Sequence, residues 1–115
     1  MVNIAKVSTL KFPVVGIKPA DIKSDMDTYI SIVTKPGHLT PAEWESYHDI
    51  DNKYLALLLD NFPDISSFHV DKDEKGYFIL LQSFVPLDEL KEIPDLQGVR
   101  TKILYIGDEG SLQEV

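Results

Sequence analysis

His48 and Asp51 are the two residues whose types and spacing come closest to a catalytic pair. Residues three apart on a helix are neighbours on its surface. A carboxylate beside a histidine raises the pKa of the imidazole and fixes its tautomer, as a general base requires. The alternative interpretation is structural, with the two side chains satisfying each other near a helix end. Because no obvious nucleophile accompanies the pair, the structural interpretation and a non-enzymatic protein are favoured.

The same stretch of sequence also contains aromatic residues that could recognise a partner. Aromatic side chains exposed on a helix are common anchors in protein contacts, whereas at helical spacing they can equally pack onto a sheet. Both interpretations stay open at this stage. The candidate partner-binding residues are Trp44, Tyr47, His48 and Asp51, with the acidic Glu45 and Asp49 beside them.

Metal ions and cofactors are not predicted. The chain has no cysteine, which excludes disulfides and Cys-based zinc, iron–sulfur or thiol chemistry. Glu45-x-x-His48 has the spacing of half a di-iron site, but such a site needs two helices of this kind. Residues 71–82 begin like a calcium loop, yet Lys75 occupies the fifth position and Gln82 stands where a bidentate glutamate should complete the coordination of the ion, so a hairpin turn is predicted there. Glycine-rich phosphate loops, a serine nucleophile elbow and HExxH are absent from the sequence.

Charge is distributed unevenly along the chain. The net charge is −8. Residues 1–35 have five lysines and three aspartates, or +2, and residues 36–115 have six bases and sixteen acids, or −10. Such a surface repels phosphate backbones and anionic membranes, so nucleic acid and membrane are not expected partners. A basic protein partner matches the sign; the alternative is that the acids only maintain solubility.

One amphipathic helix, at about residues 40–61, must position the candidate residues. Thr40, Pro41 and Glu43 form a capping box with proline at the first helical position. Pro63 ends the helix because it lacks a backbone donor. The residues predicted on its inward stripe are Trp44, Tyr47, His48, Asp51, Leu55, Leu58, Leu59 and Phe62, widened by Ile50, Tyr54 and Leu57.

Strands are predicted around this helix. Residues 2–17 read as extended, 18–25 as a connection, and 28–33 as a strand because apolar residues alternate there. A β-hairpin follows, with strands near 67–70 and 77–85 and a polar turn ending in Gly76. A short helix over 87–93 and a last strand over 99–106 complete the order. These elements predict an α+β fold, with one mainly antiparallel sheet of about five strands and the long helix packed on one face.

The length and the ends of the chain give the remaining expectations. A chain of 115 residues is the usual size of one domain, so residues 1–115 are expected to form one, with a loose acidic tail at 107–115. The first six residues do not have the pattern of a signal peptide, and no apolar run approaches the 18 residues needed to span a bilayer. We therefore expect a cytoplasmic protein-interaction module, such as an inhibitor, immunity-type protein or viral antagonist. The alternatives are a homo-oligomer subunit and a small ligand-binding domain or enzyme using His48 and Asp51.

Overall fold

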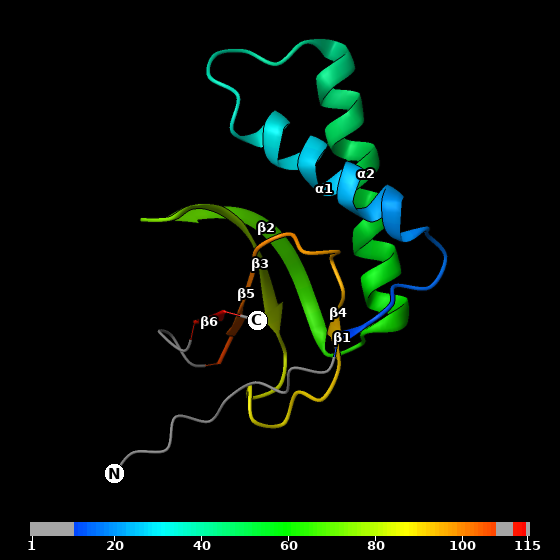
Figure 1. Cartoon of the computed structure of the whole chain (residues 1–115), viewed down its shortest axis with the longest axis vertical. Coiled ribbons are helices and arrows are strands. Elements are labelled where there is room, and N and C mark those ends of the chain that lie inside the picture. The colour runs from blue at the N-terminus through cyan, green and yellow to red at the C-terminus, as the bar shows by residue number, and fades with distance from the viewer. Residues whose placement is uncertain (1–10, 108–111, 115) are drawn as a thin grey trace.

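The computed structural model describes residues 11–107 and 112–114, and its two helices lie on one side of a sheet (Figure 1). The N-terminal part of the second helix and the loop before it extend beyond the sheet. The elements in chain order are β1 (Lys11–Phe12), α1 (Pro19–Val33), α2 (Pro41–Asn61), β2 (Ile65–Asp73), β3 (Gly76–Ser83), β4 (Ile93–Pro94), β5 (Thr101–Tyr105) and β6 (Gln113–Glu114).

The predicted long helix is confirmed as α2, with both of its ends. The Thr40 hydroxyl accepts from the Glu43 amide at 3.2 Å, and the Glu43 carboxylate accepts from the Thr40 amide at 2.9 Å. Pro41 lies at the first helical position. At the other end the Phe62 amide donates to the Leu58 carbonyl at 2.7 Å, directly before Pro63. The local sequence is therefore enough to define this element.

Helix α1 was not predicted. The expected connection over 18–25 and strand over 28–33 are wrong, since residues 19–33 form one helix. Its proline occupies the first turn, where a missing amide costs nothing. The apolar alternation near its end suggested a strand, but burial follows a helical spacing of three or four residues. The buried residues of α1 are Ile22, Met26, Tyr29 and Ile32.

The sheet is mixed rather than mainly antiparallel. Its order is β2-β3-β5-β6, and β1 and β4 form a separate parallel pair. The predicted hairpin is confirmed as β2 and β3, which pair antiparallel up to Asp73 and Gly76. Gly76 has φ +126°, a conformation that favours glycine. β3 and β5 are parallel, so the chain must cross back along the sheet between them. The α+β class holds, but the single five-stranded sheet was wrong.

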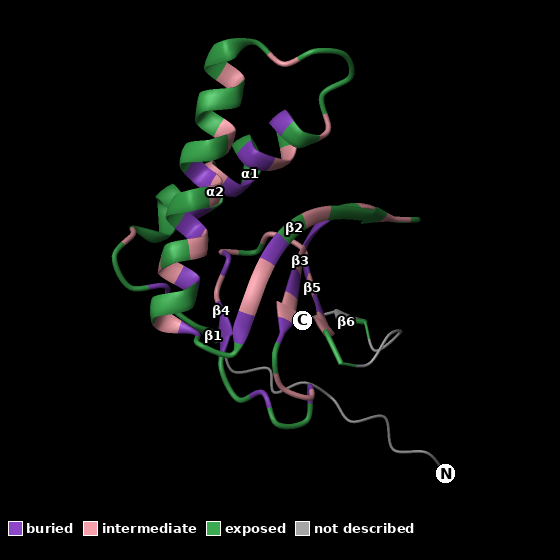
Figure 2. Ribbon diagram, turned by 180° about the vertical axis from the view of Figure 1, so that it is seen from behind, coloured by how far each residue is buried: buried purple, intermediate pink, exposed green. Residues whose placement is uncertain are grey.

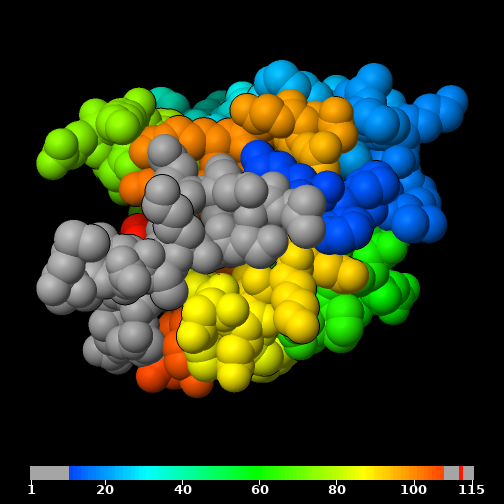
Figure 3. Space-filling model, turned by 60° about the horizontal axis from the view of Figure 1, so that its bottom comes forward, coloured from blue at the N-terminus to red at the C-terminus, as the bar shows by residue number. Residues whose placement is uncertain are grey.

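The crossing segment, residues 84–100, does not contain the predicted short helix. In place of that helix there are two overlapping turns. The Glu89 amide donates to the Pro86 carbonyl at 2.9 Å, and the Leu90 amide donates to the Leu87 carbonyl at 3.3 Å. The buried side chains of this segment include Leu87, Leu90, Ile93 and Leu96. Figure 3 shows this segment beside the first described residues, where the Asp95 amide donates to the Phe12 carbonyl at 2.9 Å.

One hydrophobic core joins the helices, the sheet and the crossing segment. Figure 2 shows the buried residues concentrated where α1 and α2 cross and along β3 and β5. The core includes Ile22, Met26, Tyr54, Leu58, Phe68, Ile79, Leu81 and Ile103. The predicted extended stretch over 2–10 lies outside the described residues. In the predicted tail, Gln113–Glu114 pair with β5. No helix among the described residues is long and apolar enough to cross a membrane.

Candidate functional site

The inward face of α2 differs from the predicted stripe. Trp44 and His48 are exposed, as is Leu59, whereas Ile50 and Tyr54 are buried. The reason is α1, which crosses α2 and covers the side of α2 on which Tyr54 lies. In Figure 2 the part of α2 that projects beyond the sheet is mostly exposed. The N-terminal half of α2 therefore leaves Trp44 and His48 exposed, whereas Tyr47 is partly buried.

His48 and Asp51 contact different neighbours. The Asp51 carboxylate accepts a hydrogen bond of 2.9 Å from the hydroxyl of Tyr29, on α1. The imidazole of His48 stacks on the Trp44 ring, with centroids 5.5 Å apart and planes inclined by 20°. Within the described part of the chain no hydrogen bond joins His48 to Asp51. The arrangement expected for an oriented general base is therefore not formed.

Trp44, Tyr47 and His48 make an aromatic cluster, and we use that name for these three residues. Tyr47 meets the other two rings edge-on, at 5.9 Å from Trp44 and 5.3 Å from His48. Tyr47 also stacks on Tyr29, with centroids 5.2 Å apart and planes inclined by 7°. Tyr29 in turn contacts Phe68 in the core at 5.2 Å. Ring contacts thus connect Trp44, which is 48% exposed, to the core, and they hold it in place.

A pocket of about 410 Å³ opens beside the aromatic cluster, and we call it the tip pocket. Its volume lies within the range of ligand-binding pockets, roughly 300 to 1,000 Å³. It lies between the end of α1, the loop over 34–40 and the first turns of α2. Sequence reasoning placed Trp44 and Tyr47 here but missed the remaining residues, because their contribution depends on α1 being a helix. The lining residues are Ile32, Val33, Lys35, Gly37, His38, Leu39, Trp44 and Tyr47.

The lysine of the tip pocket has an internal counter-ion. Lys35 Nζ lies 2.6 Å from a Glu43 carboxylate oxygen. The Lys35 ammonium, followed by the Thr40 amide, lowers the pKa of Glu43 to about 2. Glu43 therefore stays ionised at neutral pH and offsets the charge of Lys35. The mouth of the pocket is consequently less basic than its lining suggests.

The helical hairpin, residues 19–61, is strongly acidic. It has eight carboxylates and three lysines, a net charge of −5 with histidine neutral. All three lysines are in ion pairs with carboxylates of the same hairpin: Lys23 with Asp27, Lys35 with Glu43 and Lys53 with Asp25. Glu45 and Asp49 are exposed beside the aromatic cluster, and no ion pair involves either within the described residues. Their negative charge is thus available to a partner.

Two buried tyrosines tie α1 to α2. The Tyr54 hydroxyl donates to Asp25 at 2.8 Å, and the Tyr29 hydroxyl donates to Asp51. Burial, followed by side-chain hydrogen bonding, raises the pKa of both phenols above their ordinary value. The two hydroxyls are therefore protonated donors at neutral pH. Asp51, a candidate catalytic residue from the sequence, has in this structure the role of an acceptor between helices.

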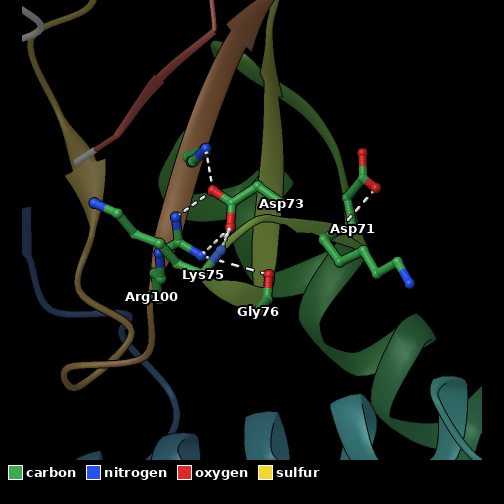
Figure 4. A network of polar contacts seen from close by, with 7 residues as sticks. Asp71, Asp73, Lys75, Gly76 and Arg100 are labelled. Carbon is green, nitrogen blue, oxygen red and sulfur yellow. Dashed lines mark hydrogen bonds and ion pairs between the residues drawn. The ribbon is translucent and has the colours of Figure 1, made fainter.

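A second charged cluster lies at the turn of the β2–β3 hairpin (Figure 4). Asp73 accepts from both terminal nitrogens of Arg100 and from Lys102 Nζ at 2.6 Å. Both cations also lie over the Phe78 ring, at 5.4 and 4.7 Å from its centroid. Arg100, then Lys102, holds the pKa of Asp73 well below its usual range. Sequence reasoning missed this Asp73 network because it depends on the parallel pairing of β3 with β5.

The acidic residues of α2, of the β2–β3 turn and of residues 88–95 do not converge on one face. These three groups lie in different parts of the molecule (Figure 1). α1 supplies a second helix, which was the missing element of the di-iron interpretation. In the described ranges, however, no three His, Asp or Glu residues are grouped so that they could hold a metal ion. The stretch that resembles the start of a calcium loop consists of the end of β2, where Asp71 pairs with Phe78, and the hairpin turn between Asp73 and Gly76.

No protein-family model matches this chain, and neither a curated protein nor a solved structure matches it. The features that indicate a function are the geometry of the aromatic cluster, the tip pocket and the charge around them.

Proposed function

We propose that this chain is an intracellular protein-interaction module, of the inhibitor, immunity or antagonist kind, that binds a basic protein through the tip of its helical hairpin. The observation that carries the proposal is Trp44, a half-exposed tryptophan that lines an open pocket and stands next to acids that have no ion pair within the described residues. Tryptophan is among the residues that contribute most to protein contacts. Acids at the rim of such a contact attract a basic partner and speed its association.

The arrangement of the aromatic cluster supports this function more than a packing role. A tryptophan needed for packing would be expected in the core, whereas Trp44 stands outside it and its neighbours keep it ordered. Order before binding reduces the entropy lost on association. The charge of the hairpin also disfavours nucleic acid, because its three lysines are already paired.

The two alternatives from the sequence have less support. The homo-oligomer alternative rested on a neighbouring subunit covering residues 77–85 or the edge formed by residues 99–106. Within the chain, however, β3 is flanked by β2 and β5, and β5 is flanked by β3 and β6. The enzyme alternative rested on Asp51 orienting His48, but Asp51 accepts from Tyr29 instead.

Photo-crosslinking in the native host tests the proposal. A photoreactive phenylalanine analogue replaces Trp44 in one variant and Tyr77 in a matched control, since these aromatic residues are 48% and 46% exposed. We expect a specific adduct with a basic protein from position 44, and none from position 77. Binding of the identified partner should weaken as salt rises to physiological levels. Equal adducts from both positions, or binding that salt does not affect, would contradict the proposal.

A further inference from the structure

The outer surface of α2 has two parallel rows of side chains beside the tip pocket. Trp44 and His48 are four residues apart and form an aromatic row, and Glu45 and Asp49, also four apart, form an acidic row next to it. Trp44 belongs to both the aromatic row and the pocket wall. A chain crossing α2 from the pocket would therefore meet an apolar cavity, then aromatic rings, then carboxylates.

We propose that the tip pocket accepts one bulky apolar side chain of a partner, and that an arginine two residues away lies over Trp44 and reaches Glu45. This inference rests on the proposed function and specifies the partner's chemistry. In an extended segment, residues i and i+2 point to the same side, at a spacing of about 7 Å. An extended segment that crosses α2 can therefore place one side chain in the pocket and the next one on the same side over Trp44.

Arginine fits this surface better than other side chains. Its guanidinium stacks on tryptophan faces and pairs with carboxylates in a planar geometry. The exposed stack of Trp44 on His48 presents an aromatic surface to it, and Glu45 supplies the carboxylate. Lysine is a weaker match, because its ammonium is compact and strongly hydrated.

The apolar part of the proposal follows from the lining of the pocket. The aliphatic side chains of Ile32, Val33 and Leu39 line the pocket together with the rings of Trp44 and Tyr47. Lys35, which also lines it, is ion-paired with Glu43. A neutral, bulky side chain can thus enter without displacing an ion pair.

Trp44 is the only tryptophan of the chain, so its fluorescence reports directly on this site. The probe is the capped peptide acetyl-Arg-Gly-Phe-Gly-Arg-amide, which places arginine two residues from phenylalanine in both chain directions. We expect a saturable change in Trp44 emission. Replacing both arginines by the neutral isostere citrulline, or the phenylalanine by alanine, should weaken binding by roughly tenfold each.

A pair of charge-matched variants tests whether the carboxylate acts locally. Glu45→Gln should weaken binding of the arginine peptide by roughly fivefold. Asp60→Asn removes the same charge from an exposed position near the other end of α2, and it should change the affinity less than twofold. Both positions are exposed, so both variants should fold, and circular dichroism checks this.

The outcomes separate this inference from the proposed function. Local arginine recognition is overturned if the citrulline peptide binds as well as the arginine peptide, or if Glu45→Gln and Asp60→Asn weaken binding equally. Neither result contradicts the proposed function, because a crosslinked partner can still occupy the tip. No change in Trp44 emission at millimolar peptide overturns the inference outright, and the crosslinking experiment then decides the proposed function independently. Light scattering that shows a dimer with quenched, buried Trp44 would make a second copy the occupant and would also overturn it.

Discussion

The Asp73 network and the tip of the helical hairpin combine the same ingredients, a large aromatic ring and several charged side chains. At the network, two cations share one carboxylate and cover the ring of Phe78, which is only 2% exposed. At the tip, the lysine is paired, the neighbouring acids Glu45 and Asp49 are exposed, and Trp44 is half exposed. The first region is satisfied internally, whereas the second leaves surface and charge available for another molecule.

The difference indicates how to distinguish stabilising from functional residues in this protein. A residue whose partners are all within the chain should change stability when it is replaced. A residue that is held in place but left exposed should change binding instead. Substitutions made in parallel in the two regions test this distinction.

Replacement of each aromatic residue by alanine should give the largest contrast. Phe78→Ala removes a buried ring and leaves a cavity beneath Arg100 and Lys102, so we expect a loss of about 3 to 5 kcal/mol in unfolding free energy. Trp44→Ala should cost less than about 1 kcal/mol, because half of its surface already faces solvent. Urea unfolding measures both. Similar losses would show that Trp44 is a packing residue and would remove the contrast.

Neutralising one carboxylate in each region should give the next largest contrast. Asp73→Asn removes the carboxylate that Arg100 and Lys102 share, so the unfolding midpoint at pH 7 should fall, whereas Glu45→Gln should leave it unchanged. The folded-state pKa of Asp73 is depressed, so its stabilisation is present above the unfolded value of about 4 and is lost as pH falls below it. The Asp73→Asn deficit should therefore shrink in acid. A deficit that is the same at pH 7 and pH 3 would indicate that charge is not its cause.

Removing the hydrogen bond between Tyr29 and Asp51, beneath the aromatic cluster, should have a smaller effect on stability. Tyr29→Phe keeps the ring that stacks on Tyr47 but removes the hydroxyl that donates to Asp51. We expect a loss of about 1 to 2 kcal/mol, since a partly buried carboxylate loses a hydrogen bond. Thermal unfolding measures the loss, and Trp44 emission should stay near that of the unchanged protein because the rings remain. A large shift in emission would show that the hydroxyl, rather than the stacking, orders the cluster.

The sequence predicted well those features that depend on neighbouring residues. The start of α2 follows from Thr40, Pro41 and Glu43, and the β-hairpin follows from its polar turn ending in Gly76. α1 was mistaken for a connection and a strand because its last turns alternate apolar residues by chance. Two local signals pointed to a helix, namely Pro19 in the first turn and the spacing of Ile22, Met26 and Tyr29.

Features that depend on residues distant in the sequence could not be predicted from local patterns. The candidate residues Trp44, Tyr47 and His48 do meet, because they share one helix. The pocket beside them needs α1 and the loop over 34–40, and the Asp73 network needs β5 to lie parallel to β3. Neither arrangement leaves a local pattern, since both are fixed by packing. The missed helix also explains why the inward stripe of α2 was misplaced, as α1 decides which side is covered.

The smallest expected effect concerns Glu43, which links the helix cap to the tip pocket. Its pKa is lowered from 4.5 to about 2, so its contribution to stability is complete above pH 4.5 and is lost as pH falls toward 2. In the Glu43→Gln variant the unfolding midpoint should therefore decrease less between pH 4.5 and about 2 than in the unchanged protein. The control variant Glu45→Gln should show the same decrease as the unchanged protein. Because the substitution also frees Lys35 from its counter-ion, the pocket becomes more positive, and an arginine peptide should bind less well at pH 7. If Glu43→Gln flattened the acid limb but left peptide binding unchanged, Glu43 would belong to the cap alone, and the boundary between the stabilising and the functional parts of α2 would lie after it.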